Sequence, residues 1–272
     1  MIQTSDLYKR LLSEEHSIET RLVIGTSGIL TTEDREGIIF GTDKGEDVRI
    51  LVEQGGPDDG FTEAEIFSMS THHELFEGQT PTVGSTVAGQ IDVSMMYGAI
   101  TIPKMAQMVP YMRLVSADGT EHSEWIKKGV YYIDTREVTH NDDGLDVITL
   151  HGYDALLKAQ ADYPSDSNSY PAKDKVIAQV IADAMGVKLD SRTLPLMNGN
   201  YRYGLPVGYS MQEVLSSIAI PYAGNWVMTD EGFLRMISLA DIPKETRLLT
   251  DEIGYAIVFG TESGNDPVRI LV

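Results

Sequence analysis

The chain has 272 residues, of which 42% are hydrophobic and 23% charged, so most of it should fold around one large core or two smaller ones. It contains no cysteine, which excludes disulfides, thiolate metal sites and cysteine nucleophiles. With 41 acidic and 21 basic residues it carries a net charge of −20, and its densest basic spot is the pair Lys127 and Lys128. Phosphate binding needs clustered Lys and Arg, so direct nucleic-acid binding is disfavoured.

The N-terminal stretch has neither a basic leader followed by an apolar run nor an Arg-rich, acid-poor composition, so no targeting segment is expected. No stretch approaches the roughly 18 apolar residues of a membrane helix. Ser5 or Asp6 is a suitable helix N-cap, and Leu7, Leu11 and Leu12 follow at helical spacing. Residues 1–20 are therefore predicted to form a helical arm that docks on the rest of the chain.

Residues 21–163 carry the signals of antiparallel strands. Apolar runs, alternating patterns and β-branched or aromatic stretches recur in RLVIG, RILV, QIDVSM, MVPYMRLV, GVYYIDTREV and LDVITLHGY. Turn sequences separate them, ADGT at 117–120 and NDDG at 141–144. The pattern predicts an antiparallel β-barrel or β-sandwich domain over residues 21–163. The Gly-, Pro- and Asp-rich stretch at 53–67 is predicted to be a long mobile loop on its side.

Residues 164–243 are predicted to form a small α/β domain. A first helix is expected to end at Gly186, and a second to begin with a capping box formed by Ser210 and Glu213. A hairpin turn is expected at 230–232. The apolar stripe predicted for the first helix consists of Val176, Ile177, Val180, Ile181, Ala184 and Met185.

Two nearly identical phrases stand far apart, GIIFGTDKGEDVRILV at 37–52 and AIVFGTESGNDPVRILV at 256–272. In each, a Phe-Gly-Thr run enters a polar turn and VRILV returns, which is the pattern of a β-hairpin; Pro267 is an extra residue in the second turn. Residues 244–272 are therefore predicted to begin a second β domain, which is either truncated or completed by another chain. Local duplication without shared function is the alternative.

The cluster of His72, His73, Glu74 and Glu77 is the most metal-like in the sequence. A zincin requires a second histidine where Glu77 stands, so these histidines are predicted to be structural or solvent-facing. The stretch 166–171 begins like a calcium loop with Asp166 and Asn168, but Tyr170 and Pro171 replace the expected acid and glycine, so it is read as a linker.

No nucleophile elbow, phosphate loop or dinucleotide fingerprint occurs. The acidic pairs at 58–59 and 142–143 lie in predicted turns, where catalysis is not expected. No catalytic residue, metal ligand or cofactor site is therefore predicted. Trp226 is expected to fill a core, whereas Trp125 is left open between a core position and stacking on a sugar.

Six phrases, LYKRLLSEEHSIETRLVIG, TVGSTVAGQIDVSM, TIPKMAQMVPYMRL, SEWIKKGVYYIDTRE, ITLHGYDALLKAQADY and YAGNWVMTDEGFLRMISL, follow one another along nearly the whole chain. In their order and spacing the chain resembles a family of tail proteins from phages and prophages of Gram-positive bacteria. That family is related to baseplate hub proteins and the late control protein D group. No single phrase is diagnostic of it.

The resemblance implies β-barrel-like tube domains separated by a small α/β domain. In such hubs three subunits, each with two tube domains, form a ring that joins the sixfold tail tube to a threefold spike or fibre. A homotrimer at the tail tip or baseplate of a virion, assembled in the bacterial host cytoplasm, is thus implied. Its expected partners are tail tube, distal tail, tape-measure and spike or fibre proteins. DNA would pass without specific binding, and no membrane insertion, enzymatic residue or cofactor is implied.

Within the leading interpretation, a non-enzymatic structural protein, strand edges would join neighbours in the ring. The loop at 55–62 and the α/β domain would contact adjacent tail components. Two alternatives come from other classes. A tail-tip cell-wall hydrolase would need a pair of acids in a cleft or a metal cluster, and a host-surface glycan-binding module would line a groove with Tyr201, Tyr203 and Tyr209.

Overall fold

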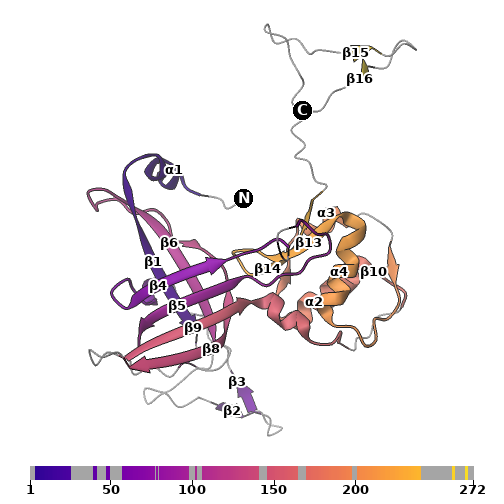
Figure 1. The fold of residues 1–272 in the computed structure, drawn as a ribbon, viewed down its shortest axis with the longest axis horizontal. Helices are drawn as coiled ribbons and strands as arrows, with labels where there is room; N and C mark the ends of the chain where they lie inside the picture. Colours follow the sequence, from indigo (N-terminus) through magenta and orange to yellow (C-terminus); the bar gives the residue numbers. More distant parts are fainter. Residues whose placement is uncertain are drawn as a thin grey trace.

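The computed structural model describes residues 4–25, 39–41, 47–49, 57–76, 78, 80–97, 102, 106–140, 146–164, 170–197, 201–239, 259–260 and 267–268. Strands of a large antiparallel sheet lie on one side of the molecule, and most helices lie on the other (Figure 1). The predicted fold class, α+β and mainly β, is confirmed. The domain boundaries predicted at 20/21, 163/164 and 243/244 stay predictions.

The large sheet has seven strands, in the order β1-β6-β8-β9-β5-β4 with β7 beside β6, and all its pairs are antiparallel. Its strands are β1 (His16–Gly25), β4 (Ile66–His72), β5 (Gln90–Met96), β6 (Gln107–Ser116), β7 (Ile126–Lys127), β8 (Tyr131–His140) and β9 (Asp146–Asp154). The helix α1 (Asp6–Ser13) precedes β1 and contacts β6. As predicted, Ser5 caps it: the Ser5 hydroxyl accepts a hydrogen bond from the Tyr8 N–H.

The first strand of this sheet, β1, is bonded to the segment that directly precedes the last strand, β4. Leu22 in β1 and Phe61 exchange two backbone hydrogen bonds, of 3.1 and 2.8 Å, which brings the sheet round into a barrel. The short helix η1 (Pro57–Asp59) and the turn from Thr62 to Glu65 flank this bridge. The long mobile loop predicted for 53–67 is therefore wrong over residues 57–67, because the bridge and β4 fix them; residues 53–56 lie outside the described residues.

The barrel interior is filled by alternate residues of its strands, as expected for a sheet that buries one face. Leu22 and Tyr131 have no exposed surface, and Val93, Met108 and Leu150 are equally well covered. The full buried cluster consists of Leu22, Ile91, Val93, Met95, Ile102, Ala106, Met108, Tyr131, Ile133, Ile148 and Leu150. The alternation seen in the sequence thus reports the inward face of the barrel.

The second core belongs to an α/β unit that follows β9. Its helices are η2 (Ala155–Gln160), α2 (Asp174–Met185), α3 (Thr193–Leu196), α4 (Met211–Ala219) and η3 (Ile220–Tyr222). Its strands are β10 (Ala172–Lys173), β11 (Lys188–Leu189), β12 (Arg202–Tyr203), β13 (Gly224–Met228) and β14 (Phe233–Ser238). The main sheet has the order β11-β14-β13, and β11 is parallel to β14. The predicted capping box of α4, left-handed Gly186 and β13–β14 hairpin are all confirmed.

The buried face of α2 differs from the predicted stripe. Val176 and Ala184 are exposed, whereas Ala178 and Ala182 are fully buried. Both η2 and α4 pack against α2, and small side chains allow helices to approach closely. The predicted stripe followed the large apolar side chains and left out these two alanines. The buried face of the helix is therefore turned toward Ala178 and Ala182 relative to the prediction.

Both copies of the duplicated phrase form the predicted hairpins. In the first, β2 (Ile39–Gly41) pairs with β3 (Asp47–Arg49), and Phe40 lies opposite Val48. In the second, β15 (Phe259–Gly260) pairs with β16 (Pro267–Val268), and Phe259 lies opposite Val268. Pro267, predicted to be an extra residue of the second turn, instead belongs to β16 and lies opposite Gly260, as Asp47 lies opposite Gly41 in the first copy. The pairing of Phe with Val is therefore the same in both copies.

Candidate functional site: the domain junction and the open strand edges

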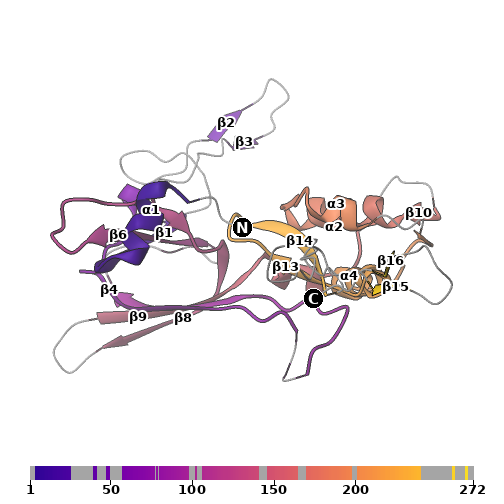
Figure 2. The same ribbon diagram turned by 90° about the horizontal axis from the view of Figure 1, so that it is seen from above.

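A segment that we call the strap, residues 73–89, joins β4 to β5 and reaches across to the α/β domain; residues 77 and 79 lie outside the described residues. Figures 1 and 2 both show it running beside β13. Gly84 donates its N–H to the Gly224 carbonyl at 2.8 Å, and Trp226 donates to the Ser85 carbonyl at 2.8 Å. The strap thus covers the outer edge of the α/β sheet.

Asn225 in β13 holds the strap through every polar atom of its fully buried side chain. Its Oδ1 accepts the Ser85 N–H at 2.9 Å. Its Nδ2 donates to the Leu75 and Thr82 carbonyls at 3.0 and 2.8 Å. A buried amide with all its bonds made fixes three points of the strap at once.

His73, at the start of the strap, faces the barrel core. Its Nε2 lies 2.6 Å from the Tyr131 hydroxyl, which donates to the Lys128 carbonyl at 3.1 Å, so Nε2 carries the proton and donates. Burial lowers the pKa of His73, with Asp230 opposing the shift, and burial raises the pKa of Tyr131. Both side chains are therefore neutral parts of a hydrogen-bonded chain at neutral pH.

Asp154, the last residue of β9, lies at the other end of the strap and is 2% exposed. Its Oδ2 accepts the Gly89 N–H at 2.7 Å, and its Oδ1 accepts the Leu156 N–H at 2.9 Å, which caps η2. Burial raises the pKa of Asp154 to about 6, although these two N–H groups favour the carboxylate. A Cβ on Gly89 would lie 2.5 Å from His73 Nδ1 and 2.9 Å from Asp154 Oδ2, so only glycine fits between them.

A cleft of about 690 Å³ opens at this junction. One wall comes from the strap and the barrel, and the other from the β13–β14 hairpin and Arg192. Arg192 is held by Asp190, whose pKa it lowers through their hydrogen bond. The polar residues that line the cleft include His73, Glu74, Asp154, Arg192, Asp230, Glu231 and Arg235. Ligand sites favour such domain junctions, but the two oxygens of Asp154 are already occupied by backbone N–H groups.

The histidine cluster picked out in the sequence does not converge on one point. Both histidines are exposed, but His72 lies 3.0 Å from Glu74, whereas the ring of His73 bonds the buried Tyr131. Glu77 lies outside the described residues. In the part of the chain that the structure describes, no three His, Asp or Glu side chains are grouped to hold a metal ion. The stretches 165–169 and 141–145, which contain Asp166, Asn168 and the acidic pair at 142–143, also lie outside it, whereas the acidic pair at 58–59 lies in the short helix η1.

The two tryptophans have different environments. Trp226 is fully buried and donates from Nε1 to the Leu215 carbonyl at 2.7 Å, which confirms the predicted core role. Trp125 lies on the barrel, with the Arg113 guanidinium carbon 4.3 Å and that of Arg21 5.8 Å from its ring centroid. The Trp125 ring therefore packs against two guanidinium groups in a cation–π arrangement.

The three tyrosines proposed for a groove are not grouped together. Tyr201 stacks edge-on against Tyr222 at 5.5 Å, and Tyr203 donates to the Ser217 carbonyl at 3.2 Å. Tyr209 is 57% exposed and lines a separate groove beside α4. Of the three, only Tyr209 lines that groove.

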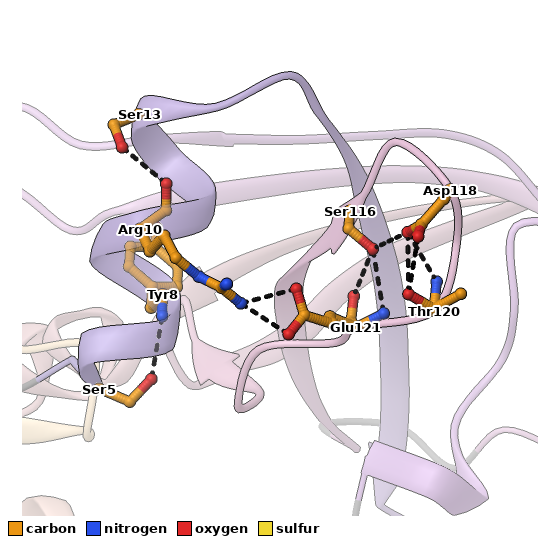
Figure 3. Close-up of polar contacts among 8 residues, drawn as sticks. All are labelled: Ser5, Tyr8, Arg10, Ser13, Ser116, Asp118, Thr120 and Glu121. Atoms are coloured by element: carbon orange, nitrogen blue, oxygen red, sulfur yellow. Dashed lines mark hydrogen bonds and ion pairs between the residues drawn. The ribbon is translucent and has the colours of Figure 1, made fainter.

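The arm helix α1 docks through one apolar and two polar contacts. Leu11 has no exposed surface, while Ser5 bonds Glu124 through both its N–H and its hydroxyl, at 2.6 and 2.5 Å. Arg10 Nη2 lies 2.6 Å from both carboxylate oxygens of Glu121, in the connection after β6 (Figure 3). Residues 5–13 thus dock on the barrel, whereas residues 16–20, which the sequence assigned to the same helical arm, belong to strand β1.

That connection is itself rigid. Asp118 accepts hydrogen bonds from the hydroxyls of Ser116 and Thr120, at 2.6 and 2.9 Å, and Gly119 adopts a φ of +71° (Figure 3). Such Asx-type bonding and a left-handed glycine define the ADGT turn predicted from the sequence. The loop therefore presents Glu121 to α1 in one fixed position.

The barrel leaves parts of two strand edges open. The Asp154 N–H bonds the Gly89 carbonyl and the Tyr97 N–H bonds the Asp146 carbonyl, so the backbone groups of odd-numbered residues in β5 point toward β9. The backbone groups of its even-numbered residues therefore point toward β4 and bond it. Met69 and Thr71 of β4 therefore point their backbone groups outward. By the same alternation Ile18 of β1 points outward, since Leu22 faces Phe61. No strand of the described residues pairs with either stretch.

Sequence reasoning missed the residues that join the domains. Asn225, Gly89 and the strap carried no motif, since their partners lie up to 150 residues away. One signal was available for Asp154, because an Asp before an apolar run is a typical N-cap.

No helix among the described residues is long and apolar enough to cross a membrane. No family model matches the chain, and no curated protein matches it. Several solved structures are similar to it. The 43 kDa tail protein of prophage MuSo2 from Shewanella oneidensis has 17% identity and a TM-score of 0.46, over 86% of this chain and 59% of that protein.

A tail protein from Neisseria meningitidis MC58 has 11% identity and a TM-score of 0.46, over 81% of this chain and 50% of that protein. The Francisella PdpA–VgrG complex has 6% identity and a TM-score of 0.41, over 88% of this chain and 35% of the matched chain. The chain thus spans between half and three-fifths of the length of the two tail proteins from Shewanella and Neisseria.

Proposed function

We propose that the chain is a structural, non-enzymatic component of a phage or phage-derived tail, a hub at the baseplate or tail tip that joins the tail tube to the spike or fibre. The resemblance of its ordered sequence phrases supports the class of protein. The outer edge of β4, which pairs with no strand of the described residues, is the observation that carries the assembly role, because unpaired N–H and C=O groups on an edge strand are a template for pairing with another chain.

The expected assembly is a homotrimer that lines the central channel and contacts tail tube, distal tail, tape-measure and spike or fibre proteins. The duplicated hairpin supports a second tube domain beginning near residue 244, since both copies share one register. The net charge of −20 supports a channel that repels the phosphate backbone rather than holding it. Its location would be the virion tail, after assembly in the host cytoplasm.

Replacing Thr71 by proline tests this role. Thr71 is exposed and directs its N–H outward, so the variant blocks added strands while the β4–β5 ladder stays intact. We expect the wild-type protein to form a trimer by light scattering and Thr71→Pro to stay monomeric. Its melting temperature should match that of Thr71→Val, which also loses the Thr71 side-chain bond to Tyr131 but keeps the outward N–H. Ser70→Pro is the contrast, because Ser70 bonds β5 and its loss should lower the melting temperature.

Two results would refute the proposal. One is a wild-type protein that is monomeric at all concentrations tested. The other is imaging of intact particles, by electron microscopy with a tagged chain, that places the protein away from the tail tip. Clearing of cell walls by the purified chain would instead support the hydrolase alternative.

A further inference from the structure

A groove of about 500 Å³ lies on the α/β domain between strap residues 84–87 and the helix α4. It is open to solvent and belongs to neither core. Its size falls within the roughly 300–1,000 Å³ of small-molecule sites. What it binds can be argued from the side chains that line it.

The walls of the groove are preformed. The strap touches α4 at Gly84, where a Cβ would lie 2.9 Å from both Ser216 Oγ and Ile220 Cγ1, and where φ is +84°. Gln212 Nε2 donates to the Thr86 carbonyl at 3.2 Å and ties the same two walls together. Because these contacts fix the strap against the helix, little ordering is needed when a ligand enters.

Tyr209 supplies an exposed aromatic ring on a fixed backbone. The ring is 57% exposed, yet the Tyr209 carbonyl accepts the Tyr163 N–H at 2.9 Å. The next residue, Ser210, caps α4 through its hydroxyl. A ring held in this way offers an apolar face to a ligand at little cost in conformational entropy.

Apart from Val87, the side chains in the rest of the lining are polar, and none of them is a cation. Gln212 Oε1, Glu213 Oε1 and Ser216 Oγ face no hydrogen-bond partner among the described residues, and they follow one another along α4. These are acceptors suited to ligand hydroxyl or ammonium groups. The single carboxylate and the net charge of −20 disfavour a phosphate or carboxylate ligand.

We propose that this groove binds a short oligosaccharide of neutral or amino-substituted pyranose rings. Such a ring has one apolar C–H face, which stacks on Tyr209, and a rim of hydroxyl groups, which pairs with Gln212, Glu213 and Ser216. A protein partner would favour a pocket lined by apolar anchors over this mostly polar groove. The proposal stands independently of the tail assignment, because a trimer and a sugar site can each exist without the other.

Calorimetric titration of the full chain tests it, with chitotriose, maltotriose and cellotriose as neutral probes and a heparin disaccharide as the anionic probe. We expect at least one neutral trisaccharide to bind. Tyr209→Ala should weaken that binding roughly tenfold, the loss expected when a stacked ring is removed, and Tyr209→Phe should retain it. Tyr201→Ala is the matched control, since Tyr201 is exposed but lies outside the groove, and it should bind as the wild type does.

The proposal would be overturned by no binding of any neutral trisaccharide, by binding that Tyr209→Ala leaves unchanged, or by preference for the heparin disaccharide. A tail protein seated on Tyr209 in the imaged particle would also overturn it. Tyr209 is exposed, so its variants should fold, and their melting temperatures check this. Glu213→Gln should reduce the affinity for the sugar independently of Tyr209. Trimer formation is unaffected in every case, which separates this test from that of the tail role.

Discussion

The two domains complete their sheets in different ways. The outer edge of β13 in the α/β domain is covered by the strap, so that sheet finds its last partner inside the chain. Within the described ranges, the barrel closes at the Leu22–Phe61 bridge, and stretches of β1 and β4 pair with no further strand. A covered edge stabilises the fold of the single chain, whereas an open edge has backbone N–H and C=O groups that can pair with a strand of another chain.

The largest expected effect is at the covered edge. Asn225→Ala would remove the bonds of the fully buried Asn225 side chain to the Ser85 N–H and to two strap carbonyls, and should lower the free energy of unfolding by about 3 kcal/mol. Urea unfolding measures this change, and hydrogen exchange at the Ser85 amide localises it. Gln212→Ala is the control, because its one bond to the strap is made by an exposed side chain, and equal losses in both variants would contradict the role given to Asn225.

A second effect depends on pH. The pKa of Asp154 is about 6 in the folded chain and near 3.8 when unperturbed, so the folded chain binds this proton more tightly than the unfolded chain does. The resulting stabilisation is complete below pH 3.8 and is lost as the pH rises through 6. Relative to Asp154→Asn, which does not titrate, the wild type should therefore gain up to about 3 kcal/mol on acidification between these limits. A wild-type-minus-variant difference that stays constant over this window would show that the junction carboxylate is not buried in solution.

The smallest effect is expected at the surface contact of α1. Arg10→Ala removes an exposed ion pair with Glu121, and exposed pairs add little to stability, so the melting temperature should stay close to that of the wild type. Leu11→Ala is the comparison, because it removes a fully buried side chain and should release α1 from β6. If the arginine variant loses as much as the leucine variant, the ion pair rather than the buried leucine holds the arm.

Much of the fold could be predicted because its signals are local. The cap at Ser5, the capping box at Ser210, the left-handed Gly186 and the turn at Asp118 each depend on residues within a few positions. Strand alternation located β5, β6 and β9, and the register of the duplicated hairpins followed from their shared letters.

The junction could not be predicted, because its bonds join residues far apart in the chain. A polar side chain such as Asn225 reads as a surface residue until three distant backbone groups are brought to it. The same holds for the barrel closure, where Phe61 lies in a stretch of loop-forming composition and is placed by its bonds to Leu22 and by packing on the barrel core. Tertiary contacts override local propensity in both places.

The strap also has a mechanical consequence. The chain passes between the two domains at both ends of the strap and again where β9 continues into η2. A single connection would act as a swivel, whereas several separate ones, anchored at Asn225 and Asp154, resist rotation of one domain about the other. Torque applied to the barrel should therefore be transmitted to the α/β domain, and the two should turn together as one rigid lever.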